Sequence, residues 1–233
     1  MTSITYVKRR SQIEDYFDRT AVETWSRLTS DDPVNGIRAT VRAGRDNMRR
    51  TLLDWLPVDL SGCRLLDAGC GTGTLAVEAA RRGADVVAVD LSPTLIDLAR
   101  SRSAGFSGPG RITFSSDDML APKLGDFDYV VAMDSLIHYA SEDIVDAIIG
   151  LSSRTRRSML FTIAPRTLAL AAMHFVGRLF PRANRAPAIQ PIAEREMIRL
   201  IVKEPRLVRW RVSQIRCIKS GFYISQAVEL RCR

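Results

Sequence analysis

One short segment combines glycines with an aspartate in a spacing that suits binding of a small molecule. Asp67 ends an apolar run and is followed by Gly69, Gly71 and Gly73. Glycines there permit a tight turn and a close approach of a ligand to the backbone, and the start of the next helix offers free N–H groups. Asp90 ends the following apolar run, where a carboxylate can accept hydrogen bonds from both hydroxyls of a ribose. The segment therefore predicts a ligand that contains a nucleoside.

The charge of this segment bears on which nucleoside is bound. A dinucleotide fingerprint has the form G-x-G-x-x-G, and its third glycine would fall at Thr74. The carboxylate of Asp67 would also repel a pyrophosphate. It suits a ligand that brings positive charge, such as the ammonium and sulfonium groups of S-adenosylmethionine. A dinucleotide enzyme and a strand–turn–helix without a ligand are the alternatives.

Alternating strands and helices supply the elements that would position these residues. The expected strands are 64–68, 85–90, 112–114, 127–133 and 159–163, and the expected helices between them are 75–82, 92–102 and 144–151. Such alternation is typical of a parallel sheet. Two further alternating runs, 209–218 and 222–230, predict an antiparallel pair at the sheet edge. The expected fold class is α/β, a doubly wound and mostly parallel sheet of seven strands.

Two helical regions flank or interrupt this pattern. Apolar spacing over residues from about 10 to 56 predicts a helical arm, which Asp31-Asp32-Pro33 and Asn35-Gly36 divide into two segments. The stretch from Pro165 to Lys203 predicts a helical insertion after the fifth strand, at about 166–204. We therefore expect an arm or lid over 1–56 and a binding domain over 57–233.

Composition limits the class of protein further. The chain has 233 residues, 46% of them hydrophobic and 26% charged, which is typical of a globular protein. No apolar run reaches the ~18–20 residues that span a bilayer, and the first ten residues lack the apolar stretch of a signal peptide. The four cysteines, at positions 63, 70, 217 and 232, are too far apart for a C-x-x-C pair. We expect a reduced, cytoplasmic protein.

Charge is distributed unevenly along the chain. Residues 1–150 hold 17 Lys and Arg against 22 Asp and Glu, whereas residues 151–233 hold 17 against 4. The net charge of +8 therefore comes from the C-terminal third, which should face an anionic partner. Nucleic acid, a membrane surface and an acidic small molecule all fit this observation.

Several segments resemble a known family. The D-x-G-x-G-x-G form with the later Asp90 resembles motif I and its partner in the seven-stranded S-adenosylmethionine-dependent methyltransferases. Five segments together are similar to the magnesium protoporphyrin IX O-methyltransferases, in the form found in purple phototrophic bacteria: Asp15–Thr20, Asp67–Gly73, Met133–Tyr139, Leu179–Pro187 and Ser220–Ser225. The resemblance covers nearly the whole chain. It implies transfer of a methyl group to one propionate of Mg-protoporphyrin IX, in chlorophyll or bacteriochlorophyll biosynthesis.

The resemblance also implies which residues hold the cofactor. In this family an acidic side chain after the third strand, and the next backbone N–H, read the adenine. The implied set is Asp67, Gly69, Cys70, Gly71, Gly73, Asp90, Leu91, Asp118, Met119 and Met133. Arg42 is a further candidate, because arginine recognises a carboxylate such as that of the methionine moiety through two hydrogen bonds. A helix cap by Asp117, or less readily by Asp118, and an exposed helix arginine are the structural alternatives.

His138 and Tyr16 are the catalytic candidates. His138, one of two histidines, follows the fourth strand, where the reacting methyl group should lie in this fold. Its imidazole would donate a hydrogen bond to the attacking carboxylate or ligate the porphyrin magnesium, although Mg²⁺ prefers oxygen; a packed histidine is the alternative. Tyr16 and Phe17 suit contact with a porphyrin face, or a hydrophobic anchor for the arm. Oxygenic relatives are expected to carry a tyrosine where this chain reads Leu28-Thr29-Ser30, so no role of that tyrosine carries over.

The expected insertion supplies the remaining substrate candidates. Arg178, Arg182 and Arg185 lie among apolar residues with no acidic ones, a pattern that suits an apolar dianion or an interfacial helix on anionic lipid. His174 is expected to pack or to face the porphyrin. The resemblance suggests the large subunit of magnesium chelatase as a partner, and peripheral contact with the inner or photosynthetic membrane.

Other functions have weaker support. A methyltransferase for another apolar anion, such as a quinone precursor, would use the same fold. A nucleic-acid methyltransferase is disfavoured, because Met133-Asp134-Ser135-Leu136 stands where an N-P-P-Y-type loop would stack a flipped base. A non-enzymatic carrier of the cofactor or of a tetrapyrrole is the fourth possibility.

Overall fold

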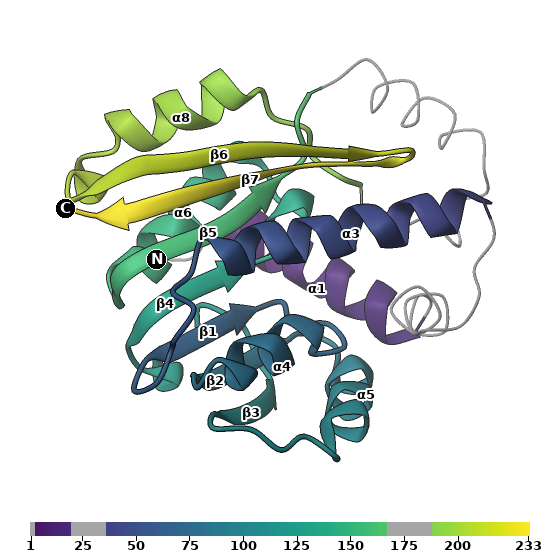
Figure 1. The fold of residues 1–233 in the computed structure, drawn as a ribbon. Helices are drawn as coiled ribbons and strands as arrows, with labels where there is room; N and C mark the ends of the chain where they lie inside the picture. The colour runs from purple at the N-terminus through teal and green to yellow at the C-terminus, as the bar shows by residue number, and fades with distance from the viewer. Residues whose placement is uncertain (1–2, 20–35, 167–187) are drawn as a thin grey trace.

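A single sheet of seven strands forms the centre of the computed structural model, which describes residues 3–19, 36–166 and 188–233 (Figure 1). The strands are β1 (Arg64–Ala68), β2 (Asp85–Asp90), β3 (Arg111–Ser116), β4 (Phe127–Ala132), β5 (Thr155–Ile163), β6 (Trp210–Ser220) and β7 (Tyr223–Cys232). Their order is β3-β2-β1-β4-β5-β7-β6, and β1 to β5 are parallel. Strand β7 runs antiparallel between β5 and β6. The expected fold class is confirmed.

Helices cover both faces of this sheet (Figure 1). They are α1 (Ile4–Arg19), α3 (Gly36–Asp54), α4 (Thr74–Arg81), α5 (Pro93–Ser103), α6 (Ser141–Ser152) and α8 (Glu194–Lys203), with the short 3₁₀ helices η1 (Pro122–Leu124), η2 (Leu136–His138) and η4 (Pro205–Leu207). Helices α1, α6 and α8 pack their apolar side chains on one face, and α3 and α4 on the other. Each face of the sheet therefore has its own hydrophobic core.

Two of the helix predictions need correction. The first helix begins at Ile4 rather than near residue 10, because the hydroxyl of Ser3 accepts the N–H of Tyr6 at 3.0 Å and caps it. The predicted helical stretch from Pro165 to Lys203 is wrong for 165–166 and 188–193. There Pro165 forms an isolated bridge to Ile192, and the chain becomes helical only at Glu194. Prolines in these segments lack the N–H of a helix and favour extended backbone in the residue before them. Residues 167–187 lie outside the description.

None of the helices within the described ranges has the length and apolar character that crossing a membrane requires.

Helix α3 lies directly against the hairpin of β6 and β7. A Cβ atom placed on Gly44 would come within 2.5 Å of the Tyr223 ring, so only glycine allows this approach. Near the end of the hairpin, the hydroxyl of Ser220 donates to the carbonyl of Thr40 at 2.8 Å. These contacts fix α3 across the end of β6 and the start of β7.

A glycine-to-alanine pair tests this contact. Alanine normally stabilises a helix interior by about 0.5–1 kcal/mol relative to glycine. Gly44→Ala should instead lower the free energy of unfolding by about 1–3 kcal/mol, because the added methyl group overlaps the Tyr223 ring. Gly150→Ala, on α6, is the matched control, since its Cβ would make only an ordinary 3.4 Å contact with Leu120. Urea denaturation measures both, and equal effects of the two substitutions would contradict the tight packing of α3.

Candidate active site

A cavity of about 230 Å³ lies at the carboxyl ends of the parallel strands. Its lining includes Asp67, Asp90, Asp118 and Asp134, each of which stands at or just after the end of a strand. Strands β1 and β4 are neighbours in the sheet without being consecutive in the chain. Ligands of doubly wound sheets bind at such a reversal of strand order.

The glycine loop after β1 has the backbone that its residues predict. Gly69 and Gly71 line the cavity with φ values of 81° and 54°, a left-handed conformation that favours glycine. A Cβ on Gly69 would come within 2.4 Å of the Cβ of Ser135, so this glycine also lets the loop after β4 approach. Gly73 has a different function, because a Cβ there would meet the ring of Phe114 at 2.8 Å. It permits packing of α4 and is not among the described residues that line the cavity.

Asp67 is the least compensated carboxylate of the site. Its side chain is buried, and its Oδ2 atom has no hydrogen-bond partner among the described residues. Burial, with a smaller contribution from the charge of Asp90, raises the pKa of Asp67 to about 7, although the backbone N–H of Ala76 opposes the shift. A cationic group placed at Oδ2 would stabilise the ionised form.

Asp90 has hydrogen-bond donors on both carboxylate oxygens, and the thiol of Cys70 is uncharged. The Oδ2 of Asp90 accepts the N–H of Gly71 at 2.9 Å, and its Oδ1 accepts the N–H of Ser92 at 3.0 Å. Burial raises the pKa of this carboxyl despite those bonds. Burial also raises the pKa of the Cys70 thiol well above its usual value, so Cys70 is a neutral wall of the cavity at neutral pH.

The carboxylate of Asp118 binds helix α1. Its Oδ1 accepts the Tyr6 hydroxyl at 3.0 Å and the N–H of Leu120 at 2.9 Å, and its Oδ2 pairs with Arg10 at 2.8 Å. The buried Tyr6 ring also stacks on Tyr139, with 4.7 Å between the ring centres. Asp118 therefore holds the arm over the cavity, and its expected contact with adenine stays a prediction.

A second carboxylate fixes the other end of α1. Asp18 accepts hydrogen bonds from the hydroxyl of Ser92 at 3.0 Å and from both the N–H and the hydroxyl of Thr94. These donors belong to the first turn of α5, where a negative charge is favourable. Helix α1 is thus attached at both ends, and its Phe17 lines the cavity between them.

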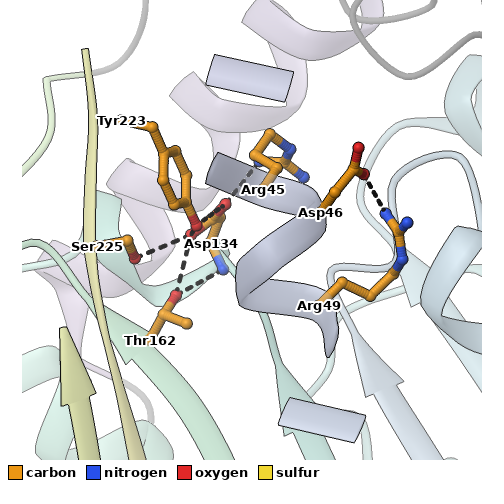
Figure 2. Close-up of polar contacts among 7 residues, drawn as sticks. All are labelled: Arg45, Asp46, Arg49, Asp134, Thr162, Tyr223 and Ser225. Carbon is orange, nitrogen blue, oxygen red and sulfur yellow. Dashed lines mark hydrogen bonds and ion pairs between the residues drawn. The ribbon is translucent and has the colours of Figure 1, made fainter. Parts of the chain in front are cut away.

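Asp134 joins four elements at the end of β4 (Figure 2). Its carboxylate pairs with Arg45 of α3 at 2.7 Å and accepts hydroxyl groups from Tyr223 and Ser225 of β7 and from Thr162 of β5, at 3.1 to 3.2 Å. The side chain is 5% exposed, and its φ of 54° is unusual for a residue other than glycine. Asp134 therefore connects α3 to the strand ends and directs the loop that carries His138.

The six aspartates that line the cavity differ in how the chain compensates them. Asp46 pairs with Arg49 at 2.9 Å, and Asp117 pairs with Lys123 at 2.6 Å. Asp90, Asp118 and Asp134 have the donors described above. Only Asp67 combines deep burial with an oxygen that no donor or cation of the described residues contacts. A neutral or anionic ligand would leave that charge uncompensated, whereas a ligand that carries a cation would compensate it.

The other expected site residues fall into three groups. Leu91, Met119, Met133, Arg42, Phe17 and His138 line the cavity. Tyr16 is half-buried, with its ring 5.2 Å from that of Phe17, and is not among the described lining residues. His174, Arg178, Arg182, Arg185 and the Leu28–Ser30 segment lie outside the described residues.

Sequence reasoning missed residues whose partners are distant in the chain. Tyr6 and Arg45 line the cavity, but the sequence did not predict them as site residues. Their partners Asp118 and Asp134 are 112 and 89 positions away in the chain. One signal was available. Met133–Tyr139 and Ser220–Ser225 were both singled out by the family resemblance, and they meet at Asp134.

Comparisons with known proteins agree with this geometry. A family model described as magnesium-protoporphyrin IX methyltransferase C-terminus matches residues 132–232, and a methyltransferase domain matches residues 65–157. A magnesium-protoporphyrin O-methyltransferase of Rhodobacter capsulatus is 48% identical over 97% of this chain and 98% of its own length. One from Synechocystis is 33% identical over 74% of this chain and 76% of its own.

A solved structure matches the fold as well. The crystal structure of magnesium protoporphyrin IX methyltransferase from Synechocystis with bound SAH superposes with a TM-score of 0.83 at 26% identity. The match covers 97% of this chain and 100% of that one.

The strand order and the glycine loop, together with the matching methyltransferase domain and solved structure, define a class I S-adenosylmethionine-dependent methyltransferase. Within this class, the chain belongs to the magnesium-protoporphyrin O-methyltransferase family.

The raised pKa of Asp67 predicts pH-dependent cofactor binding. Without a ligand the carboxyl is mostly protonated below its pKa of about 7, whereas a cationic ligand favours the ionised form. Binding therefore releases a proton, and affinity for S-adenosylmethionine should rise about 5- to 10-fold from about pH 6 to about pH 7.5. Asp67→Asn should bind more weakly and without this slope.

Isothermal titration calorimetry across this range measures the effect. Asp97→Asn serves as the control, because Asp97 is exposed on α5 and pairs only locally with Arg100. It should retain the pH slope of the original chain. A slope that persists in Asp67→Asn would contradict the assignment.

The ion pair of Arg45 and Asp134 makes a separate prediction. Asp134→Asn keeps a residue that tolerates positive φ but removes the carboxylate that pairs with Arg45, which should lower the free energy of unfolding by about 2–4 kcal/mol. The double variant with Arg45→Met removes both charges and should recover at least about 1 kcal/mol of that loss. Urea denaturation of the two single variants and the double variant gives the coupling energy. Simple addition of the two costs would show that the pair does not join α3 to the sheet.

Proposed function

We propose that this chain transfers a methyl group from S-adenosylmethionine to a propionate carboxylate of Mg-protoporphyrin IX and releases the monomethyl ester, in chlorophyll or bacteriochlorophyll biosynthesis. The supporting observation is the composition of a single cavity. One wall carries the bare carboxylate oxygen of Asp67, while α3 contributes Arg42, Arg45 and Arg49 to the lining. Such a cavity suits a cationic methyl donor beside an anionic acceptor.

The main requirement of this reaction is that the protein aligns the two reactants. When bound, S-adenosylmethionine supplies an electrophilic methyl group on its sulfonium. A propionate is already ionised at neutral pH, so its oxygen needs no strong general base. The side chains of Ile13, Phe17 and Met133 line the cavity and exclude water, which otherwise stabilises the separated charges. The catalytic contribution of the chain is then to hold the carboxylate oxygen in line with the methyl group.

His138 is placed to orient that carboxylate. It lies in η2 directly after β4, is 8% exposed, and has its ring 6.0 Å from that of Phe17. An imidazole N–H can donate to an oxygen of the acceptor without removing a proton from it. Burial raises the pKa of Tyr16, so this phenol stays neutral at neutral pH, and we assign it the positioning of Phe17.

His138→Ala should separate catalysis from cofactor binding. We expect kcat to fall by about 100-fold or more, because the acceptor loses its orienting donor, while the SAH dissociation constant changes by less than about 3-fold. His138→Gln retains an N–H donor and should recover part of the rate. Steady-state kinetics and calorimetry on the same preparations measure both quantities. An unchanged kcat in His138→Ala would remove His138 from the mechanism.

The acceptor itself is tested with labelled S-adenosylmethionine. Mg-protoporphyrin IX should become labelled as a base-labile methyl ester, whereas its dimethyl ester, which has no free carboxylate, should not. A phenolic quinone precursor is the second acceptor to assay, because a methyltransferase for another apolar anion would share this fold. Labelling of the phenol but not of the porphyrin would overturn the proposal.

We further propose two contacts for this chain. Contact with the large subunit of magnesium chelatase is supported by the family resemblance alone. Peripheral association with a membrane is supported by the arginine-rich, apolar sequence of residues 167–185. We propose no role in nucleic-acid binding.

A further inference from the structure

A second cleft, of about 710 Å³, lies at the opposite end of the sheet from the proposed methyl-transfer site. It is lined by the starts of β4 and β5, the end of β7 and the segment that follows α3. In Figure 1 the arrowhead of β7 lies at the C-terminus, on the side of the sheet from which the arrows of β1 and β4 point away. The size falls within the range of about 300–1,000 Å³ that is common for small-molecule sites.

Five arginines line this cleft. They are Arg156, Arg157, Arg209, Arg231 and Arg233, and we refer to the site as the arginine cleft. None of the described lining residues is acidic. Like charges gathered in this way repel one another, so the cleft favours an anionic occupant.

Carboxylates near the arginine cleft compensate some of these charges. Arg231 lies 3.0 Å from Glu229, Arg157 lies 3.5 Å from Asp128, and Arg156 lies 3.9 Å from Asp126. Arg209 and Arg233 form no ion pair with any residue that the structure describes. Their backbones are joined directly, since the N–H of Arg233 donates to the carbonyl of Arg209 at 2.8 Å. Two arginines on adjacent backbone therefore have no ion-pair partner for their side chains among the described residues.

A buried hydroxyl adds an independent observation. Ser158 lines the arginine cleft and is 2% exposed, and its Oγ atom has no partner among the described residues. The sheet register places Ser158 directly beside Tyr129 of β4 and Arg231 of β7. Buried hydroxyls normally have a hydrogen-bond partner, so an orphaned one in a cleft indicates a missing acceptor.

The number of donors favours one kind of anion. A carboxylate has two oxygens, whereas a phosphate presents three terminal oxygens that several guanidinium groups can share. Trp55, Pro57 and Tyr129 form apolar walls beside the arginines and would contact the organic part of a phosphate ester. We propose that the arginine cleft binds a phosphate group, at a site separate from methyl transfer. This site does not depend on the proposed function.

Inorganic pyrophosphate is the first probe. The full chain should bind it saturably in calorimetry at low salt, and Arg209→Gln combined with Arg233→Gln should weaken binding by about 10-fold or more. Arg216→Gln is the matched control, because Arg216 is exposed on β6 and does not line the cleft. It should bind pyrophosphate like the original chain. Unchanged SAH affinity in all variants verifies that the fold is retained.

Vesicles distinguish the source of the phosphate. Sedimentation with vesicles of phosphatidylglycerol in phosphatidylcholine should require Arg209 and Arg233 if the natural group is a lipid headgroup, and pyrophosphate should then compete. Binding of pyrophosphate without binding of vesicles indicates a free phosphate ester. If neither probe binds, or if Arg216→Gln weakens binding as much as the double variant, the proposal is wrong.

Discussion

Six aspartates surround one cavity at the carboxyl end of the sheet, and the arrangement of the helices depends on how their repulsion is relieved. Buried carboxylates are costly unless donors or cations reach them. The chain supplies such partners to five of the six, from backbone N–H groups, hydroxyls, arginines and a lysine. Asp67 keeps one oxygen bare at the tip of β1. This is the place where a cation from outside the chain completes the charge balance.

The same compensation closes the site. The donors for Asp118 come from α1, and the cation for Asp134 comes from α3. Each of these two contacts therefore attaches a helix across the strand ends. The same contact compensates the charge of the carboxylate, so that it repels an anionic acceptor less. Gly44 allows α3 to lie close enough to Tyr223 for this pairing. Compensation of charge and exclusion of water thus arise from one set of interactions.

The local parts of the site could be predicted from sequence. The glycine loop and Asp90 depend on short spacings within one strand–turn–helix unit, and the structure has the expected turn. The junction at Asp134 could not be predicted, because Arg45 and Tyr223 each lie 89 positions away and only the tertiary fold joins them. The early start of α1 depends on a single capping serine. The segments near Pro165 are extended because proline lacks the N–H of a helix, and the spacing of apolar residues does not reveal this constraint.

The central claim is that Asp67 is held with an uncompensated oxygen until a cationic ligand arrives. Carbon-13 NMR of the labelled Asp67 carboxyl, titrated with and without S-adenosylmethionine, tests it most directly. Without ligand the carboxyl should titrate with a pKa of about 7, and bound ligand should lower this value by about 1–3 pH units. A pKa near the ordinary value of an aspartate in the free protein, or the same pKa in both states, would contradict the account.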